Sequence, residues 1–307
     1  MAMKVVQLVR LIRPTHWIKN VIVLFPVVFA MRMGDLGAWG RAVLATAVFC
    51  LVASAAYVAN DIRDRHSDRL HPRKKDRPLA SGQVSVRAAW AVAVVLLVAG
   101  AAAAWVLGPI TLVVVLGYVL LQAAYTLWLK HRMILDVMAI SLGFVLRAAA
   151  GGVAIHVELS PWLFICTFTI CLFMGFCKRR SEAAAIPDTD TAARHRATLP
   201  GYTPQLLTHL TTLSAAIAIV SYLLYATAQR TMDNFHTTYP YLIVTLPLVI
   251  YGICRFEMLS SFGRYTDPTD LILRDRPFQM TMALWALTVL VIVWRGPVLE
   301  QWLRGQF

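Results

Sequence analysis

Three aspartates and an asparagine stand close together in the segment "NDIRDRHSDRLHPRKKDR", residues 60–77. They are Asn60, Asp61, Asp64 and Asp68, at positions i, i+1, i+4 and i+8. Because residues three and four apart are neighbours on a helix, this spacing puts the four side chains on one face. Carboxylate and amide oxygens are ligands that suit Mg²⁺, which often bridges protein carboxylates to substrate phosphates. The spacing therefore predicts a magnesium site for a diphosphate.

A solvated charged face is the alternative. Arg63, Arg65 and Arg69 are interleaved with the acids and could pair with them. These arginines fall mostly on other faces of the same helix, so the pairing would be incomplete. The carboxylates would then repel one another unless another cation lies among them. The metal interpretation is favoured and the self-paired helix stays open.

A basic turn follows the acids and carries Arg73, Lys74, Lys75 and Arg77. Cationic side chains beside a metal-bound carboxylate suit an anionic substrate with more charge than one metal neutralises. Lys74 and Lys75 could instead contact anionic lipid head groups. Arg73 and Arg77 flank the turn, which fits a substrate contact better.

The composition determines what positions these residues. Apolar residues make up 59% of the 307 residues and charged ones 15%, whereas soluble domains have roughly 45–50% and about 25%. A bilayer core of about 30 Å needs about 20 apolar residues of helix. Nine such runs are present, at about 17–32, 40–60, 87–107, 109–129, 134–153, 160–177, 207–227, 238–256 and 279–296. The sequence predicts an all-α polytopic membrane protein, a bundle of nine transmembrane helices forming a single domain over 1–307.

The formal net charge of +13 raises the question of nucleic acid binding. Most Lys and Arg residues, however, fall in the N-terminal segment and in four of the loops, all on one side of a nine-span topology. That asymmetry follows the positive-inside rule. It predicts a multi-pass protein of the inner (plasma) membrane with its N-terminus and active site cytoplasmic, and no nucleic acid partner. The five cysteines fall in or beside apolar runs and are interpreted as small hydrophobic residues.

Further polar residues occur at the same membrane face. "YTLWLKHRMILD" carries Tyr125 and Lys130, and "KRRSE" follows the sixth run. Lys130 and Arg132 could be ordinary positive-inside anchors, although Lys130 also fits a phosphate contact. Arg147 is about eleven residues into the fifth run, roughly 16 Å deep at 1.5 Å per residue. A charge at that depth normally lines a cavity, so Arg147 is predicted to make a polar contact.

These motifs carry a resemblance to a known family. "NDIRDRHSDRLHPRKKDRPLASG" after the second run, with "RPTHWIKN" before the first and nine runs in all, resembles the UbiA superfamily of intramembrane prenyltransferases. The resemblance implies a Mg²⁺-bound diphosphate in a central cavity open to the cytoplasmic face and sideways to lipid. It implies that Asn60, Asp61, Asp64 and Asp68 bind the metal directly or lie in the shell around it.

One departure from that pattern matters. Aromatic prenyltransferases of the superfamily carry a second Asp-rich motif after the sixth span, where this chain has Lys178, Arg179 and Arg180. Glu182 is the acid expected to face inward there. The basic replacement, with "LRAAAGGVAI" and "LILRDRP", is similar to the decaprenyl-phosphate phosphoribosyltransferase branch, whose donor carries an extra 5-phosphate. The branch implies Mg²⁺-dependent transfer of 5-phosphoribose from phosphoribosyl diphosphate to a polyprenyl phosphate, towards a cell-wall arabinan precursor.

By this resemblance the site residues receive roles. The expected catalytic residues are Asp61, Asp64, Asp68 and Lys130. The expected substrate-binding residues are Lys19, Asn60, Arg73, Arg77, Tyr125, Arg147, Lys178, Arg179 and Glu182. In "LILRDRP", internal pairing of Asp275 is nearly as well supported as a substrate contact.

Two other functions have less support in the sequence. Transfer of a polyprenyl group from its diphosphate to an aromatic or other small acceptor predicts a second acidic cluster, which the sequence lacks. A lipid transporter or scaffold predicts polar residues and broken helices near the midplane, whereas the charges here gather at one face. The sequence leaves open whether the protein is a homo-oligomer.

Overall fold

The structure is a computed structural model that describes residues 5–70, 74–158, 160–184, 198–262 and 268–304. Within these residues the chain is helical and has no β-strand. It divides into two compact units. The first contains helices α1 to α6 apart from the end of α2, and the second contains α7 to α13.

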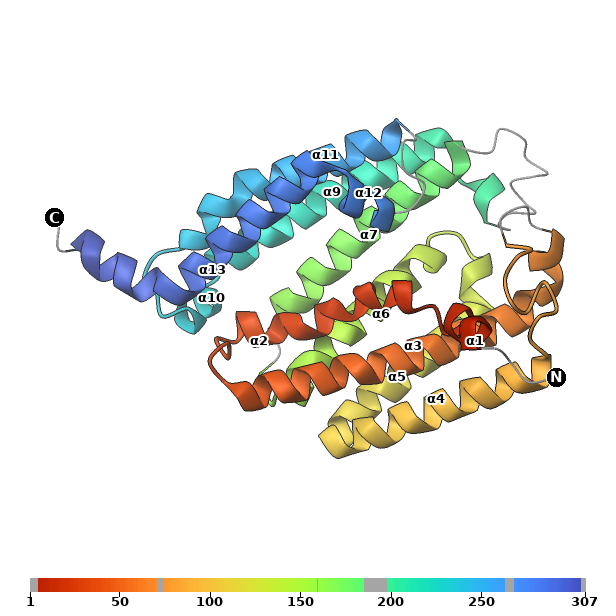
Figure 1. The fold of residues 1–307 in the computed structure, drawn as a ribbon. Coiled ribbons are helices and arrows are strands. Elements are labelled where there is room, and N and C mark those ends of the chain that lie inside the picture. Colours follow the sequence, from red (N-terminus) through yellow and green to blue (C-terminus); the bar gives the residue numbers. More distant parts are fainter. Residues whose placement is uncertain (1–4, 71–73, 159, 185–197, 263–267, 305–307) are drawn as a thin grey trace. The chain divides into compact units, whose positions relative to one another are not determined.

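The first unit is built around one long helix. Its elements are α1 (Val5–Ile12), the 3-10 helix η1 (Pro14–Leu24), α2 (Phe25–Phe29, whose end belongs to the second unit), α3 (Leu36–Leu70), α4 (Val86–Leu107), α5 (Pro109–Leu127), the 3-10 turn η2 (Leu129–His131) and α6 (Leu135–Ala154). Helix α3 lies alongside α4 over most of its length (Figure 1). Phe49, Val52 and Tyr118 are buried where α3 and α5 meet.

The second unit is a bundle in which α7 packs on α9 and α11 packs on both. Its elements are α7 (Pro161–Ala184), η3 (Leu199–Gly201), α9 (Pro204–Thr227), α10 (Gln229–Asn234), η4 (Tyr241–Thr245), α11 (Leu246–Ser261), α12 (Pro268–Arg274) and α13 (Arg276–Arg304). Phe173, Phe256 and Phe278 form part of its core, with ring centroids 5.6 and 6.0 Å apart in the two adjacent pairs.

Local sequence signals explain where several helices begin. Ser85 and Thr203 cap α4 and α9, and each side chain accepts a hydrogen bond at 3.2 Å from the backbone N–H three residues on. Such caps satisfy one of the N–H groups that a helix start leaves unpaired. Gly108 joins α4 to α5 with φ of 133°, a backbone conformation that favours glycine.

Eight helices in the described residues are long and apolar enough to cross a membrane. Their number, length and composition are those of a multi-pass membrane protein. The predicted first span at about 17–32 differs, because residues Pro14–Phe29 form a shorter apolar segment that is mostly 3-10 helix. Arg13, Lys19 and Pro26, which crowd that stretch, disfavour a regular apolar α-helix. All five cysteines are free thiols, as expected.

Gly151 of α6 allows η1 to lie against that helix. A Cβ atom placed on Gly151 would overlap the backbone oxygen of Val23. Since that oxygen belongs to main chain, Gly151→Ala should push η1 away and lower the free energy of unfolding by about 1–3 kcal/mol, as overpacking does. Thermal unfolding in detergent measures this. Gly117→Ala is the control, because its Cβ would meet nothing within 4 Å; equal melting temperatures for the two variants would contradict the expected clash.

Candidate functional site

Helix α3 is longer than a bilayer core requires, and the acidic residues lie in its last turns. It has 35 residues, which at 1.5 Å per residue is about 50 Å, against a core of about 30 Å. Its first part is the apolar run and its last turns hold Asn60 to Asp68. The expectation that the second predicted span continues as helix through the acids is confirmed.

Asp61 is buried and held by two arginines. Its side chain is 3% exposed. Arg13 Nη2 donates to its Oδ1 at 2.5 Å and to its Oδ2 at 2.7 Å, and Arg77 Nη1 donates to Oδ1 at 3.1 Å. Arg13 also lies over the Tyr57 ring, with its Cζ 5.5 Å from the centroid. A carboxylate this far from water needs such partners, because an unpaired buried charge is very costly.

Arg77 joins Asp61 to Asp68. The same Nη1 that donates to Asp61 donates to Asp68 Oδ2 at 2.7 Å. The Asp68 side chain is 5% exposed and that of Arg77 is 27% exposed. One cationic nitrogen therefore lies between two buried carboxylates, which point to a common position.

Asp64 belongs to a second, adjacent group. Its Oδ1 accepts a bond of 2.6 Å from Lys130 Nζ, and its Oδ2 accepts one of 3.0 Å from Asn60 Nδ2. Lys130 also donates to Asn60 Oδ1 at 3.3 Å. Lys130 comes from η2, so this contact joins the loop after α5 to the end of α3.

Helix geometry explains why the four predicted ligands form two groups. Asp61 and Asp68 are seven residues apart, which is about two turns, so they lie on one line. A helix turns by about 100° per residue. Asn60 therefore lies roughly 100° around the helix from Asp61, and Asp64, three residues on, lies roughly 60° from it on the same side. In the part of the chain that the structure describes, no three His, Cys, Asp or Glu side chains gather as a ready metal site. The four side chains thus share one broad face without converging on one point.

The interleaved arginines do not neutralise these acids. Arg63 donates to the Leu127 carbonyl oxygen, Arg65 contacts His66, and Arg69 donates to the Ala80 carbonyl oxygen. The cations that do pair with the acids come from other segments. The alternative that the acids pair with arginines of their own helix is therefore wrong for the contacts of the described residues.

Arg13 was not predicted as a site residue. It lies between α1 and η1 in the left-handed region, with φ 54° and ψ 63°. Non-glycine residues in that region are uncommon and often mark functional or constrained positions. The signal in the sequence was indirect: "IRPT" places a lone arginine before a proline that ends one helix, close to an acidic helix that needs external cations.

Arg147 is buried within the first unit, as a polar contact requires. Its guanidinium donates to Asn20 Oδ1 at 2.8 Å, to the Gly143 oxygen at 2.9 Å and to Tyr118 Oη at 2.7 Å. Its Cζ lies 4.7 Å from the Tyr118 ring centroid and 5.2 Å from that of Phe144. These contacts fix the approach of η1 and α5 to α6, and a role in binding substrate stays a prediction.

The basic cluster after the sixth predicted span lies at the end of α7 in the second unit. Arg179 is buried with a side chain 1% exposed, and its Nη1 contacts Glu182 Oε2 at 2.5 Å. Lys178 is half-buried. Glu182 thus pairs with a residue of its own helix, an interaction that the i, i+3 spacing allows.

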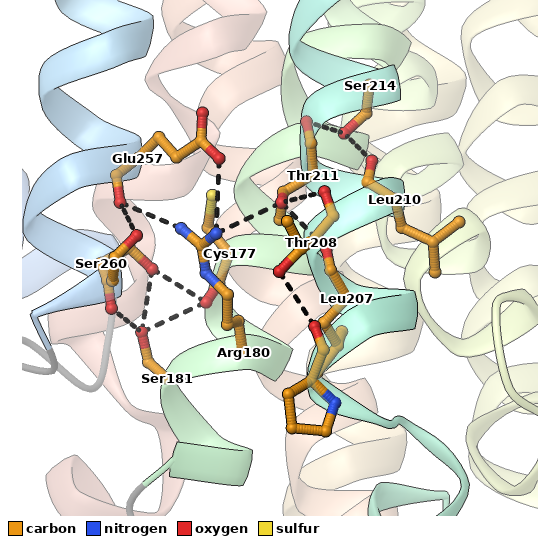
Figure 2. A network of polar contacts seen from close by, with 12 residues as sticks. Cys177, Arg180, Ser181, Leu207, Thr208, Leu210, Thr211, Ser214, Glu257 and Ser260 are labelled. Carbon is orange, nitrogen blue, oxygen red and sulfur yellow. Dashed lines mark hydrogen bonds and ion pairs between the residues drawn. The ribbon is translucent and has the colours of Figure 1, made fainter.

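Arg180 connects three helices of this unit. Figure 2 shows its guanidinium between Glu257 of α11 and Thr211 of α9, with distances of 3.3 Å to Glu257 Oε1 and 3.4 Å to Thr211 Oγ1. Ser181 and Ser260 lie beside it, with their hydroxyl oxygens 2.9 Å apart. These contacts hold the cationic end of α7 in a fixed place within its unit.

Four further residues singled out in the sequence are Lys19, Arg73, Tyr125 and Asp275. Lys19 in η1 and Tyr125 in α5 are half-buried in the first unit, and their roles stay predictions. Arg73 lies outside the described residues. Asp275 accepts bonds of 2.7 and 2.9 Å from Arg255 and one of 2.8 Å from the Phe278 backbone N–H, so it pairs internally and caps α13.

Comparison with known proteins identifies the family. The model of the UbiA prenyltransferase family matches residues 21–258. This chain belongs to the UbiA prenyltransferase family. The resemblance drawn from the acidic motif is confirmed.

Curated relatives extend the likeness over nearly the whole chain. A decaprenyl-phosphate phosphoribosyltransferase of Mycobacterium tuberculosis is 35% identical over 285 residues, 92% of each chain. Proteins with the same name from Mycolicibacterium smegmatis and Corynebacterium glutamicum are 34% and 32% identical, over 92% and 95% of this chain and 91% and 88% of theirs. This UbiA family member is thus similar to phosphoribosyltransferases in particular.

Solved structures share its fold. A UbiA homolog from Archaeoglobus fulgidus bound to DMAPP and Mg²⁺ matches with a TM-score of 0.69, covering 93% of this chain and 98% of the other. The identity is 19%, so this match shows the fold alone.

Proposed function

We propose that this chain transfers 5-phosphoribose from phosphoribosyl diphosphate to a polyprenyl phosphate of the decaprenyl type, releasing diphosphate. The observation that carries this proposal is the identity of about one third to decaprenyl-phosphate phosphoribosyltransferases over about nine tenths of both chains. The charges agree with it, because Lys178, Arg179 and Arg180 replace an acidic motif and suit a donor with an added phosphate.

The membrane arrangement that goes with this function has nine crossings. Residues Pro14–Phe29 combine 11 residues of 3-10 helix with five of α-helix. At about 2.0 and 1.5 Å per residue, this segment is about 30 Å long, which is the thickness of the hydrocarbon core. With the basic loops inside, we place the N-terminus, the acidic end of α3 and a cavity open to it at the cytoplasmic face of the plasma membrane. We take residues 1–307 as one catalytic domain.

The donor atoms present fit a divalent cation. Asp61 and Asp68 point to one position that already holds a cationic nitrogen, and both offer the oxygen ligands that Mg²⁺ prefers. Mg²⁺ there would neutralise charge on the leaving diphosphate. Asn60 and Asp64, roughly 60–100° around the helix from Asp61, would bind water or donor groups beside it.

The cationic side chains would bind the phosphates. Lys130 and Arg77 already contact the acidic residues, and their side chains are 13% and 27% exposed. Lys130 provides a compact charge and Arg77 a planar fork that matches phosphate oxygens. Lys178 and Arg179 are proposed to serve the same purpose for further phosphate groups, and Lys19, Arg73, Tyr125 and Arg147 to contact the substrates.

The reaction exchanges one bond for another at the ribose C1. The bond between C1 and the diphosphate oxygen breaks, and its electron pair leaves with the diphosphate. An oxygen of the polyprenyl phosphate forms the new bond to C1 from the opposite face. Because this acceptor is already anionic, no strong general base is needed. Positioning and charge stabilisation by the site would supply most of the rate.

The test is a transfer assay with the purified protein in lipid. Labelled phosphoribosyl diphosphate with decaprenyl phosphate should give labelled lipid, and chelation of divalent ions should stop it. The competing arm supplies a polyprenyl diphosphate with an aromatic acceptor. Product in that arm alone would overturn the proposal in favour of prenyl transfer.

A further inference from the structure

We propose that Arg77 is a displaceable counter-ion, which occupies the divalent-cation position between Asp61 and Asp68 until metal and donor bind, and then moves to the donor's diphosphate. This inference rests on the proposed function for the identity of the donor. Its first half, the occupation of a metal position by an arginine, concerns this chain's own residues only.

The position of a single atom supports the first half. Arg77 Nη1 lies 3.1 Å from Asp61 Oδ1 and 2.7 Å from Asp68 Oδ2. These are the only two acids of α3 that lie on one line of the helix about two turns apart. A cation that bridges these oxygens must take the place of this nitrogen, since both are drawn to the same pair of negative charges.

Arg77 is better placed to leave than Arg13 is. Arg13 donates to both oxygens of Asp61, whereas Arg77 joins Asp61 to Asp68, and the Arg13 side chain is 19% exposed against 27% for Arg77. A carboxylate oxygen accepts more than one partner, so Asp61 can keep Arg13 while it binds a metal. Arg13 is therefore a positioning residue that holds Asp61 in place in both states.

The backbone at Arg77 is fixed while its side chain is not enclosed. Its N–H donates to the Lys74 oxygen at 3.0 Å, and its carbonyl accepts from the backbone N–H and the hydroxyl of Ser81, both at 2.9 Å. The side chain can therefore swing about a constant anchor and stay beside the site. Released from two carboxylates, its guanidinium fork has free donors for two diphosphate oxygens.

The balance of charges makes replacement of Arg77 by a divalent cation favourable only when the metal and the donor bind together. In the contacts described, three carboxylates meet three cationic side chains, from Arg13, Arg77 and Lys130. A divalent cation alone would bring excess positive charge to this balanced group. With a diphosphate the displaced arginine gains a new anionic partner. Metal and diphosphate should consequently bind cooperatively, each strengthening the other.

The experiment measures binding without turnover. Mn²⁺ affinity of the full chain in lipid nanodiscs is measured by electron paramagnetic resonance, with and without inorganic diphosphate. Arg77→Gln should bind Mn²⁺ alone on the order of tenfold more tightly, the effect of one charge-assisted hydrogen bond. The same variant should lose most of the cooperativity with diphosphate. Unchanged or weaker Mn²⁺ binding by Arg77→Gln would overturn the proposal.

Two further variants separate this effect from general electrostatics and from misfolding. Arg63→Gln removes the same charge two residues from Asp61, but Arg63 is exposed and bonds to the Leu127 oxygen; it should leave Mn²⁺ affinity within about twofold, since exposed charges are screened. Arg77→Lys keeps the competing charge, so Mn²⁺ affinity should stay near wild type while diphosphate binding falls with the loss of the fork. If Arg63→Gln raised Mn²⁺ affinity as much as Arg77→Gln, the effect would come from the loss of any nearby positive charge. The proposed displacement of Arg77 by the metal would then be wrong. Because no transfer is measured, failure of the proposed reaction would be seen separately.

Discussion

Asp61→Asn should reduce kcat/KM for phosphoribosyl transfer by on the order of 10³, the loss expected when a group stabilising transition-state charge is removed. Asp61 is the carboxylate shared by Arg13 and Arg77, and with Asp68 it offers the converging oxygens for a divalent cation. Asparagine keeps the shape but removes the negative charge and one oxygen ligand. Steady-state transfer rates in lipid at saturating Mg²⁺ measure the effect.

Asp76→Asn is the matched control for this variant. Asp76 is an exposed acid in the loop after α3, and its removal should leave transfer within about twofold because exposed charges contribute little. Membrane insertion and the melting temperature of Asp61→Asn are compared with wild type, since two arginines lose their charged partner. An inserted, folded Asp61→Asn protein with near-normal transfer would contradict the assigned site.

Lys130→Gln should lower kcat/KM by about 10², mostly through a higher KM for the donor. Its ammonium is a point charge with a side chain only 13% exposed, 2.6 Å from Asp64, so it acts where water screens little. Loss of a buried charged contact in a binding site costs about 2–5 kcal/mol, which includes this range. Initial rates at varied donor and varied polyprenyl phosphate separate the two KM values.

Arg132→Gln provides the comparison two residues further on. Arg132 is exposed and lies over the Trp128 ring, 5.7 Å from its centroid, as an interfacial anchor would. Its removal should change neither KM by more than about twofold. If both variants lost activity equally, Lys130 would be an ordinary anchor, which is the alternative weighed from the sequence. If Lys130→Gln raised only the KM for polyprenyl phosphate, Lys130 would bind the phosphate of the acceptor and not that of the donor.

Much of the acidic helix could be predicted because its information is local. The apolar run, the continuous helix and the spacing of Asp61, Asp64 and Asp68 depend only on nearby residues and on 3.6 residues per turn. The caps of α4 and α9 are local in the same sense, because Ser85 and Thr203 each bond to the backbone three residues on. Eight of the nine predicted spans correspond to helices of sufficient length in the described residues.

The partners of the acids could not be read from the sequence. Arg13 is 48 residues from Asp61 and Lys130 is 66 residues from Asp64, so these pairs depend on how η1 and η2 fold back on α3. Local pairing with Arg63 or Arg65 was the nearer alternative. The burial of Asp61 decided against it, because a buried carboxylate takes the cations that tertiary packing brings to it.

The first predicted span is mostly 3-10 helix and not regular α-helix, and this too depends on contacts with distant residues. Its 3-10 path is stabilised by contacts that hydropathy does not contain: Trp17 Nε1 donates to Ser54 Oγ at 3.1 Å, and Asn20 accepts from Arg147 at 2.8 Å. Gly151 supplies the space for the close approach. Two side-chain contacts, one to α3 and one to α6, together with the close approach at Gly151, thus outweigh the preference of an apolar run for regular α-helix.

The most direct test is a structure of the protein in lipid with Mn²⁺ and phosphoribosyl diphosphate, with diffraction recorded at the manganese absorption edge. We expect a manganese peak bound by oxygens of Asp61, Asp68 and the donor's diphosphate, with Arg77 turned to the phosphates. Asp61 and Asp68 still joined by Arg77, with the donor bound and no manganese beside them, would contradict it.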